Sequence, residues 1–190
     1  HQFGYYYTLD RHKVSSTYIG DNQYGYPTFD TVRTPAGEAV YQLKYRRDFS
    51  QAQVLAGLVH QHIVPRLEAQ IGLVIPMPAS TQRARQPVTE VASALAKLLG
   101  INAWDNILQK ADAENAPSLK NLDGWQAKME ALKGRFVLNE AITDEGRWNA
   151  ILLDDLYDTG ASMQTAMALL KRYRKLNKVF FVALTRKSST

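Results

Sequence analysis

The sequence predicts an α/β fold with a mainly parallel β-sheet flanked by helices. Short apolar runs alternate with longer segments in which apolar residues recur at helical spacing, and no strong hairpin signal follows residue 50. Such alternation is typical of right-handed βαβ units, whose parallel sheets are covered by helices on both faces. The 190 residues, 45% hydrophobic and 22% charged, can build the core of one domain and exclude a disordered or fibrous chain.

Residues 1–37 form a segment that is rich in tyrosine, glycine and proline. Eight of the ten tyrosines precede residue 46, and glycine and proline interrupt the segment at short intervals. This pattern is typical of short strands joined by turns. We therefore expect an N-terminal extension over residues 1–37, as a hood or a satellite, and a main domain over residues 38–190.

The first elements of the main domain follow from apolar spacing and from proline. Residues 54–63 have helical spacing, which Pro65 interrupts. The apolar run 71–75 predicts a buried strand that ends in a stiff loop containing Pro76 and Pro78. A helix is expected next, with Pro87 in its first turn and Gly100 just beyond its end.

The later elements repeat this alternation. Residues 111–134 are polar and predict an insertion with a helix near 125–132, which we expect to close over a site as a lid. Apolar runs predict further strands at 136–138, 150–153 and 179–184. Apolar residues at helical spacing predict one more helix over 163–173.

The composition excludes several classes of site. The chain has no cysteine, which excludes disulfides, cysteine-ligated zinc and thiol nucleophiles, and fits the reducing cytoplasm. No apolar run approaches the roughly 20 residues of a membrane span, so no membrane association is expected. We expect a cytoplasmic protein.

Positive charge is concentrated at the C-terminus. The formal net charge is +5, and residues 171–190 contain seven basic and no acidic residues. Such a segment could bind nucleic acid through phosphate contacts. Cations at a helix end also complement its dipole and face solvent, and we favour this interpretation because no aromatic stacking pattern accompanies them.

The segment 150–162 combines a strand, two acids and a small-residue loop. The predicted strand leads into Asp154 and Asp155, and a short loop from Asp158 to Ser162 leads into the next helix. Open α/β sheets bind ligands at this end of their strands, and backbone N–H groups at a helix N-terminus can hold a phosphate. A Walker A motif and a GxGxxG motif are both absent. An acidic pair beside a phosphate site is suited to sugar hydroxyls or a cation.

This segment resembles the signature of the type I phosphoribosyltransferases, and a capping turn is the alternative interpretation. The resemblance implies their fold and binding of phosphoribosyl pyrophosphate with Mg²⁺. In this reading Asp154 and Asp155 contact the ribose hydroxyls, and Mg²⁺ through these hydroxyls or water. The loop that holds the 5′-phosphate corresponds to Asp158, Thr159, Gly160, Ala161 and Ser162.

A second group of motifs resembles the ComF competence-protein branch of this family. It comprises Leu43-Lys44-Tyr45, the loop after Val74 and the segment 83–88, although the cysteine-rich zinc module found in that branch is absent. By this resemblance the pyrophosphate is bound by Pro78, Ala79, Ser80, Arg83 and Arg85. Guanidinium groups are suited to phosphate oxygens, but a solvated basic turn is an equally good interpretation of the two arginines.

Asp158 is the candidate catalytic residue. In purine-using relatives an aspartate at this position is a candidate base for a proton of the nucleobase, and a carboxylate can act as a general base. An aspartate before Thr-Gly at a helix start is also an ordinary N-cap. The sequence leaves both roles open.

Together these features predict a glycosyltransferase of nucleotide metabolism that acts on a pentosyl group. The expected reaction is Mg²⁺-dependent transfer of a phosphoribosyl group to a nitrogen nucleophile, such as a nucleobase, with release of pyrophosphate. The alternative is a non-catalytic protein that binds phosphoribosyl pyrophosphate or a nucleotide in DNA uptake or repair. The resemblance also implies a homodimer.

Overall fold

A five-stranded sheet forms the centre of the described chain, which comprises residues 6–111, 125–132 and 134–187 of this computed structural model. The strand order is β1-β9-β8-β4-β5, and each neighbouring pair is parallel. The strands are β1 (Tyr6–Arg11), β4 (Ile71–Pro76), β5 (Asn102–Ala103), β8 (Trp148–Tyr157) and β9 (Leu176–Arg186). The predicted α/β fold with a mainly parallel sheet is therefore confirmed.

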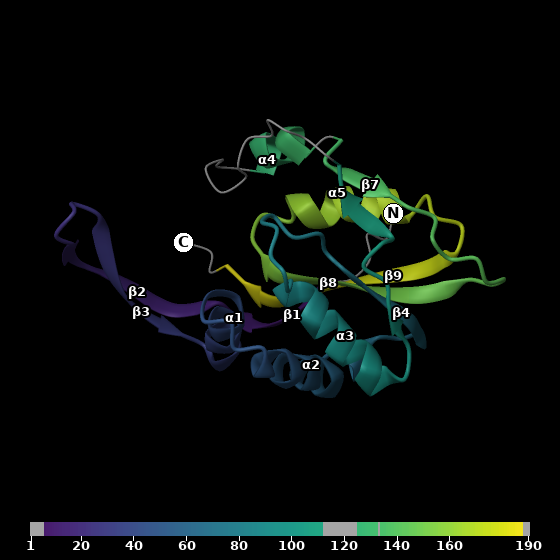
Figure 1. Ribbon diagram of the computed structural model, residues 1–190, viewed down its shortest axis with the longest axis horizontal. Helices are drawn as coiled ribbons and strands as arrows, with labels where there is room; N and C mark the ends of the chain where they lie inside the picture. The colour runs from purple at the N-terminus through teal and green to yellow at the C-terminus, as the bar shows by residue number, and fades with distance from the viewer. Residues whose placement is uncertain (1–5, 112–124, 133, 188–190) are drawn as a thin grey trace.

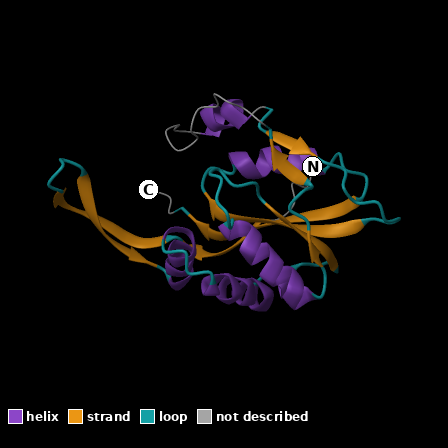
Figure 2. Ribbon diagram, in the orientation of Figure 1, coloured by secondary structure: helices purple, strands orange, loops and turns teal. Residues whose placement is uncertain are grey.

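Helices cover both faces of this sheet (Figures 1 and 2). One face packs against three helices, and the other against two helices and a short antiparallel strand pair. The first group is α1 (Pro35–Tyr45), α2 (Ser50–His62) and α3 (Pro87–Leu99), with the 3₁₀ turn η1 (Val64–Arg66) after α2. The second is α4 (Trp125–Leu132), α5 (Ala161–Leu170), β6 (Leu108–Lys110) and β7 (Phe136–Leu138). Alternate residues of the central strands enter opposite cores, which explains their continuous apolar runs.

Local signals set the bounds of α1, which the sequence analysis did not predict, and of α3, which it did. Gly100 ends α3 with φ +67°, a left-handed conformation that glycine adopts at little cost. Thr34 caps α1, because its hydroxyl accepts a hydrogen bond of 3.0 Å from the N–H of Gly37. Both helices begin with a proline, Pro35 in α1 and Pro87 in α3.

The strand β8 is longer than the apolar run that predicted it. We expected a strand that ends at the two acids, but β8 continues beyond them to Tyr157. The reason is tertiary, because β9 remains paired with β8 as far as Tyr157 and Arg186. The backbone of the acidic pair is thus held in the central sheet rather than in a loop.

The N-terminal segment contributes to two separate structures. The strand β1 is an edge strand of the central sheet, paired with β9. The strands β2 (Lys13–Asp21) and β3 (Pro27–Arg33) form an antiparallel ribbon that extends away from the rest of the molecule (Figure 1). The described part of the segment expected over 1–37 is therefore divided among the sheet, this ribbon and the first turn of α1.

The polar insertion is only partly described. The helix predicted near residues 125–132 is α4, but residues 112–124 lie outside the described chain, and the lid expected over 111–134 stays a prediction. Within the described ranges, no helix is long and apolar enough to cross a membrane.

Candidate functional site

A pocket of about 200 Å³ lies where β4 and β8 end. The loop that follows β4 borders it on one side, and residues of α4, β6 and β7 border it on another. Lys44 from α1, Ser162 from the first turn of α5 and residues 86–88 at the start of α3 also line it. The acidic pair of β8 faces this pocket, at the edge where ligands bind to open α/β sheets.

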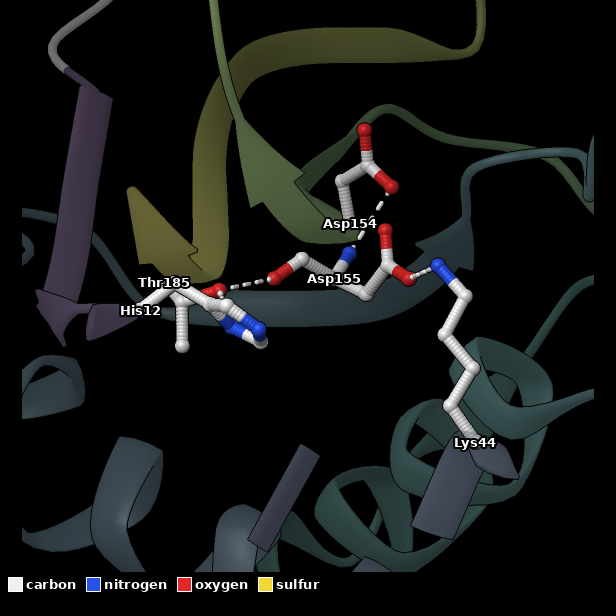
Figure 3. A network of polar contacts seen from close by, with 5 residues as sticks. All are labelled: His12, Lys44, Asp154, Asp155 and Thr185. Carbon is white, nitrogen blue, oxygen red and sulfur yellow. Dashed lines mark hydrogen bonds and ion pairs between the residues drawn. The ribbon is translucent and has the colours of Figure 1, made fainter. Parts of the chain in front are cut away.

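The two aspartates are held in different ways. The backbone N–H of Asp155 donates a 2.8 Å hydrogen bond to Oδ1 of Asp154. The Asp155 carboxylate forms an ion pair with the ammonium group of Lys44, which reaches it from the last turn of α1 (Figure 3). The pair therefore presents one carboxylate that already has a cation and one that has only a backbone donor among these contacts.

Burial and charge shift the pKa values of these groups in a connected way. Burial raises the pKa of Asp154 well above its ordinary value of 3.8, and the negative charge of Asp155 raises it further. Burial lowers the pKa of Lys44, but attraction to Asp155 and the hydrogen bond with it outweigh burial, so that the net shift is upward. Asp154 therefore gains a proton more readily than an exposed aspartate does.

Two residues behind the pair support its backbone. Thr185 is fully buried, and its hydroxyl donates a 2.9 Å hydrogen bond to the backbone carbonyl of Asp155. Nδ1 of His12 lies 3.3 Å from the same hydroxyl (Figure 3). Because that hydroxyl already donates to Asp155, Nδ1 of His12 is the donor in the second contact. Burial, and then the charges of Arg33 and Lys13, lower the pKa of His12.

Sequence reasoning missed this support. His12 lies in the tyrosine-rich segment, and Thr185 ends an apolar run that predicts only a strand. Neither position carries a local signal, because the contact depends on the pairing of β1 and β8 with β9.

The predicted phosphate loop is a tight connection between β8 and α5. Gly160 has φ +82°, and a Cβ at this position would lie 2.8 Å from the Tyr157 hydroxyl, so that both the backbone and the neighbouring ring require glycine. The hydroxyl of Thr159 accepts a 3.5 Å hydrogen bond from the N–H of Ala161, at the start of α5. Of the five predicted loop residues, Ser162 is the one whose place in the pocket lining is established.

Asp158 lies at the beginning of this loop. Its Oδ1 atom is 3.5 Å from Nζ of Lys187, and the backbone N–H of Lys187 donates a 2.8 Å hydrogen bond to the carbonyl of Tyr157. Lys187, which follows β9, thus lies against the end of β8, and its ammonium group forms an ion pair with Asp158.

The loop after β4 brings most of the predicted pyrophosphate residues to the pocket. The lining includes Pro78, Ala79, Ser80 and Arg83 together with the acidic pair. Arg85 has other contacts, because its guanidinium donates two 2.8 Å hydrogen bonds to Glu90 and lies 3.7 Å from the centre of the Phe49 ring. Arg83 is therefore the better placed of the two arginines to meet a ligand in the pocket.

The pocket lining includes two further cationic residues that the sequence analysis did not predict. Lys110 ends β6 and Arg135 precedes β7, and the antiparallel register pairs Lys110 with Phe136. Burial lowers the pKa of Lys110, and the positive charge of Arg135 lowers it further. The two residues flank a long insertion, so no spacing in the sequence brings them together.

Asp154 and Asp155 are the carboxylates of the pocket lining that could bind a metal ion. In the ranges that the structure describes, no cluster of three or more histidine, aspartate or glutamate side chains could hold a metal ion. Two carboxylates do fit a hard cation such as Mg²⁺, which keeps several waters and takes many of its oxygens from the substrate.

Comparison with known proteins gives similarity only to solved structures. No family model and no curated protein matches the sequence. The chain is similar to an adenine phosphoribosyltransferase with 15% identity and a TM-score of 0.46, over 90% of this chain and 86% of the other. For adenine phosphoribosyltransferase from Thermoanaerobacter pseudethanolicus, the identity is 13% and the TM-score 0.45, over 90% of this chain and 95% of the other. For a hypoxanthine phosphoribosyltransferase from Staphylococcus aureus, the identity is 13% and the TM-score 0.42, over 75% of this chain and 69% of the other. At these scores the likeness does not assign a function to this chain.

Proposed function

We propose that this protein transfers a phosphoribosyl group from phosphoribosyl pyrophosphate to a nitrogen nucleophile. The observation that carries the proposal is the position of Asp154 and Asp155, which share one pocket with Ser162 at the start of α5 and with the loop 78–83. An acidic pair suited to sugar hydroxyls thus shares the pocket with a helix N-terminus suited to one phosphate and with a loop whose Arg83 is suited to another.

In the proposed reaction, the bond between ribose C1 and the pyrophosphate oxygen breaks, and its electron pair leaves with pyrophosphate. A nitrogen lone pair of the acceptor forms the new bond to C1, and the acceptor loses one proton. The developing positive charge at C1 is stabilised by oriented anions nearby, which is the role we assign to Asp154 and Asp155. Arg83 stabilises the leaving pyrophosphate through its charge and its planar donors.

Mg²⁺ is the metal that we propose for this site. When bound, it would neutralise charge on the pyrophosphate and promote its departure. The carboxylates of Asp154 and Asp155 would hold it, through ribose hydroxyls or water. The protonation of Asp154 makes the affinity depend on pH, because only the ionised carboxylate attracts a cation.

For the acceptor proton, we propose Asp158 as the general base. Its Oδ1 atom lies 3.5 Å from Nζ of Lys187, so that an ion pair holds this carboxylate at the start of the predicted phosphate loop. The same ion pair supports a second candidate function, which is binding without turnover. In that case the contact between Asp158 and Lys187 orders the loop and has no part in proton transfer. Pyrophosphate release distinguishes the two functions.

The test is calorimetric titration of phosphoribosyl pyrophosphate, with and without Mg²⁺, into the wild type and into the Asp154→Asn/Asp155→Asn variant. We expect Mg²⁺-dependent binding in the wild type and at least about a 100-fold weaker affinity in the variant, which corresponds to about 2.7 kcal/mol. The control is Asp144→Asn/Glu145→Gln, which removes two adjacent charges at exposed positions and should bind as the wild type does.

Two results would contradict the proposal. One is the absence of binding by the wild type, and the other is equal affinity in the wild type and the double variant. If binding occurs, pyrophosphate release should be measured with a panel of nucleobases in the wild type and in Asp158→Asn. Binding with no pyrophosphate release for any base would favour the second candidate function.

A further inference from the structure

The ion pair between Lys44 and Asp155 lies within the wall of the candidate pocket. Both residues line the pocket, together with Asp154. Figure 3 shows the Lys44 side chain extended toward Asp155, with its ammonium group against Oδ2. An ion or a ligand that enters the pocket therefore meets the ammonium group and the carboxylates together.

The packing of α1 directs Lys44 to this position. The Thr34 hydroxyl accepts the hydrogen bond that caps the helix and donates one to the carbonyl of Arg11, at the end of β1. A Cβ at Gly37 would collide with the backbone carbonyl of His12, so this turn of α1 lies directly against the chain that follows β1. The last turn of α1 then carries Lys44 to the end of β8. The ammonium group is thus positioned by the fold before a ligand binds.

The charges of this part of the pocket give a free divalent cation little attraction. Asp154 and Asp155 supply at most two negative charges, and Lys44 offsets one of them. Arg83 and Lys110 add positive charge to the same lining. Mg²⁺ also needs carboxylate oxygens for its coordination shell, and the ammonium group already contacts Oδ2 of Asp155. A metal ion that binds Asp155 has to displace Lys44 from it.

We propose that Lys44 is a resident cation, which takes the place of a metal ion at Asp155 until a ligand binds. It keeps free metal ions away from the acidic pair, and its ammonium group moves to an anionic oxygen of the ligand when ligand and metal bind together. Lysine is suited to this exchange, because its charge is compact and lies on a flexible stem. The inference rests on the Mg²⁺ site proposed above and assigns Lys44 as a positioning residue of that site.

The first test measures binding of Mn²⁺, a paramagnetic probe of Mg²⁺ sites, by electron paramagnetic resonance without phosphoribosyl pyrophosphate. We expect the wild type to bind Mn²⁺ with a dissociation constant above about 1 mM, and Lys44→Gln to bind it at least about tenfold more tightly. The glutamine removes the charge, and its amide can still donate a hydrogen bond to Asp155. A gain of affinity separates this role from a structural one, because damage to the site would weaken binding.

Lys110→Gln is the matched control, because Lys110 is a lysine of the same lining that lies on β6, away from the ion pair. It should change Mn²⁺ affinity by less than about threefold, through charge at a distance alone. Lys44→Gln/Asp155→Asn should lose the gain, because the carboxylate that Lys44 occupied is then absent. Equal Mn²⁺ affinity of the wild type and Lys44→Gln, the same gain in Lys110→Gln, or a gain that persists in the double variant would each overturn the proposal.

A second test restores the ammonium group chemically. The chain has no cysteine, so Lys44→Cys introduces a single thiol. Alkylation with bromoethylamine converts it into a side chain of about the length and charge of lysine, whereas iodoacetamide gives a neutral side chain. We expect weak Mn²⁺ binding after bromoethylamine and at least about tenfold tighter binding after iodoacetamide. Equal affinity of the two products would overturn the proposal; mass spectrometry verifies alkylation, and circular dichroism verifies that each product folds.

The role of Lys44 and the proposed function can fail separately. The Mn²⁺ measurements contain no phosphoribosyl pyrophosphate, so a gain of affinity in Lys44→Gln supports the resident cation even if calorimetry detects no binding of that ligand. Conversely, Mg²⁺-dependent binding of phosphoribosyl pyrophosphate, with equal Mn²⁺ affinity in the wild type and Lys44→Gln, would overturn the role of Lys44 alone.

Discussion

The end of β8 and the ribbon of β2 and β3 depart from the usual distribution of side chains in opposite directions. In β8 the chain carries two adjacent carboxylates into a pocket, whereas the ribbon carries tyrosine and isoleucine into solvent. Buried charges are normally paired, and large exposed apolar surfaces normally have a partner. The Asp155 carboxylate has its partner within the chain, in the Lys44 ammonium group, and the Asp154 carboxylate accepts a hydrogen bond from the N–H of Asp155. Several large side chains of the ribbon stay exposed in the described chain, at Tyr18, Ile19, Tyr24 and Tyr26.

The largest effect expected at the end of β8 comes from Lys44→Met, which leaves the Asp155 carboxylate without its ammonium group. The free energy of unfolding should fall by about 2 kcal/mol, because an unpaired charge remains in a largely buried position. This is less than for a fully buried pair, since Lys44 and Asp155 are 25% and 18% exposed. Urea unfolding at neutral pH measures the change.

Two controls sharpen this prediction. Lys44→Arg retains the positive charge and should recover most of the stability. Asp30→Asn removes a charge from the exposed ribbon and should change the free energy of unfolding by less than about 0.5 kcal/mol. If Lys44→Met is as stable as the wild type, the ion pair makes no net contribution and the comparison between the two regions fails.

A smaller effect is expected from Gly160→Ala, compared with Gly25→Ala at the tip of the ribbon. Both glycines have a left-handed φ, +82° and +76°, so each alanine introduces a strain of about 1 kcal/mol. At Gly160 the new methyl group also displaces the Tyr157 hydroxyl, whereas nothing lies within 4 Å at Gly25.

We therefore expect Gly160→Ala to lower the free energy of unfolding by about 1.5 kcal/mol. Gly25→Ala should lower the free energy of unfolding of the core by less than about 0.5 kcal/mol, because the ribbon can open locally. Thermal unfolding and titration with phosphoribosyl pyrophosphate measure both effects. Gly160→Ala should weaken binding and Gly25→Ala should not. Equal losses of stability would show that the ribbon and the core unfold together.

Sequence reasoning predicted those parts of the fold that local chemistry determines. The helix from Pro87 to Gly100 has its start, its apolar stripe and its end in the sequence, and the structure agrees with all three. The strand β4 follows in the same way from a short apolar run that ends at proline. Sequence also predicted the place of Asp154 and Asp155 at a ligand-binding edge, since a strand followed by a small loop and a helix has only a few arrangements.

The remainder of the site depends on contacts between segments that are distant in the sequence. His12 and Asp155 are 143 positions apart, and they are connected only because β1 and β8 both pair with β9. Lys110 and Arg135 meet because β6 pairs with β7 across an insertion. The sequence also did not predict the exposure of the ribbon, because tyrosines among glycine and proline are as typical of a packed hairpin as of an exposed one.

The smallest effect concerns the pH dependence of stability, and it is expected at Asp154. Burial and the charge of Asp155 raise the pKa of Asp154 in the folded protein above its ordinary value of 3.8. The folded state therefore holds this proton at pH values where the unfolded state has lost it. Between the unfolded and the folded pKa, the stability of the wild type should fall as the pH rises, by at most about 1.4 kcal/mol per pH unit for one group.

The variant Asp154→Asn removes this titration while its side-chain oxygen can still accept the hydrogen bond from the N–H of Asp155. Its stability relative to the wild type should increase with pH above about 4 and become constant above the folded pKa of Asp154. Urea unfolding at several pH values between about 4 and 8 measures this difference, and Asp30→Asn controls for the loss of one negative charge. Parallel pH profiles for Asp154→Asn and the wild type would mean that the carboxylate is solvated in the folded state. Asp154 would then resemble an exposed residue of the ribbon, and the end of β8 would no longer be a place where the fold buries charge.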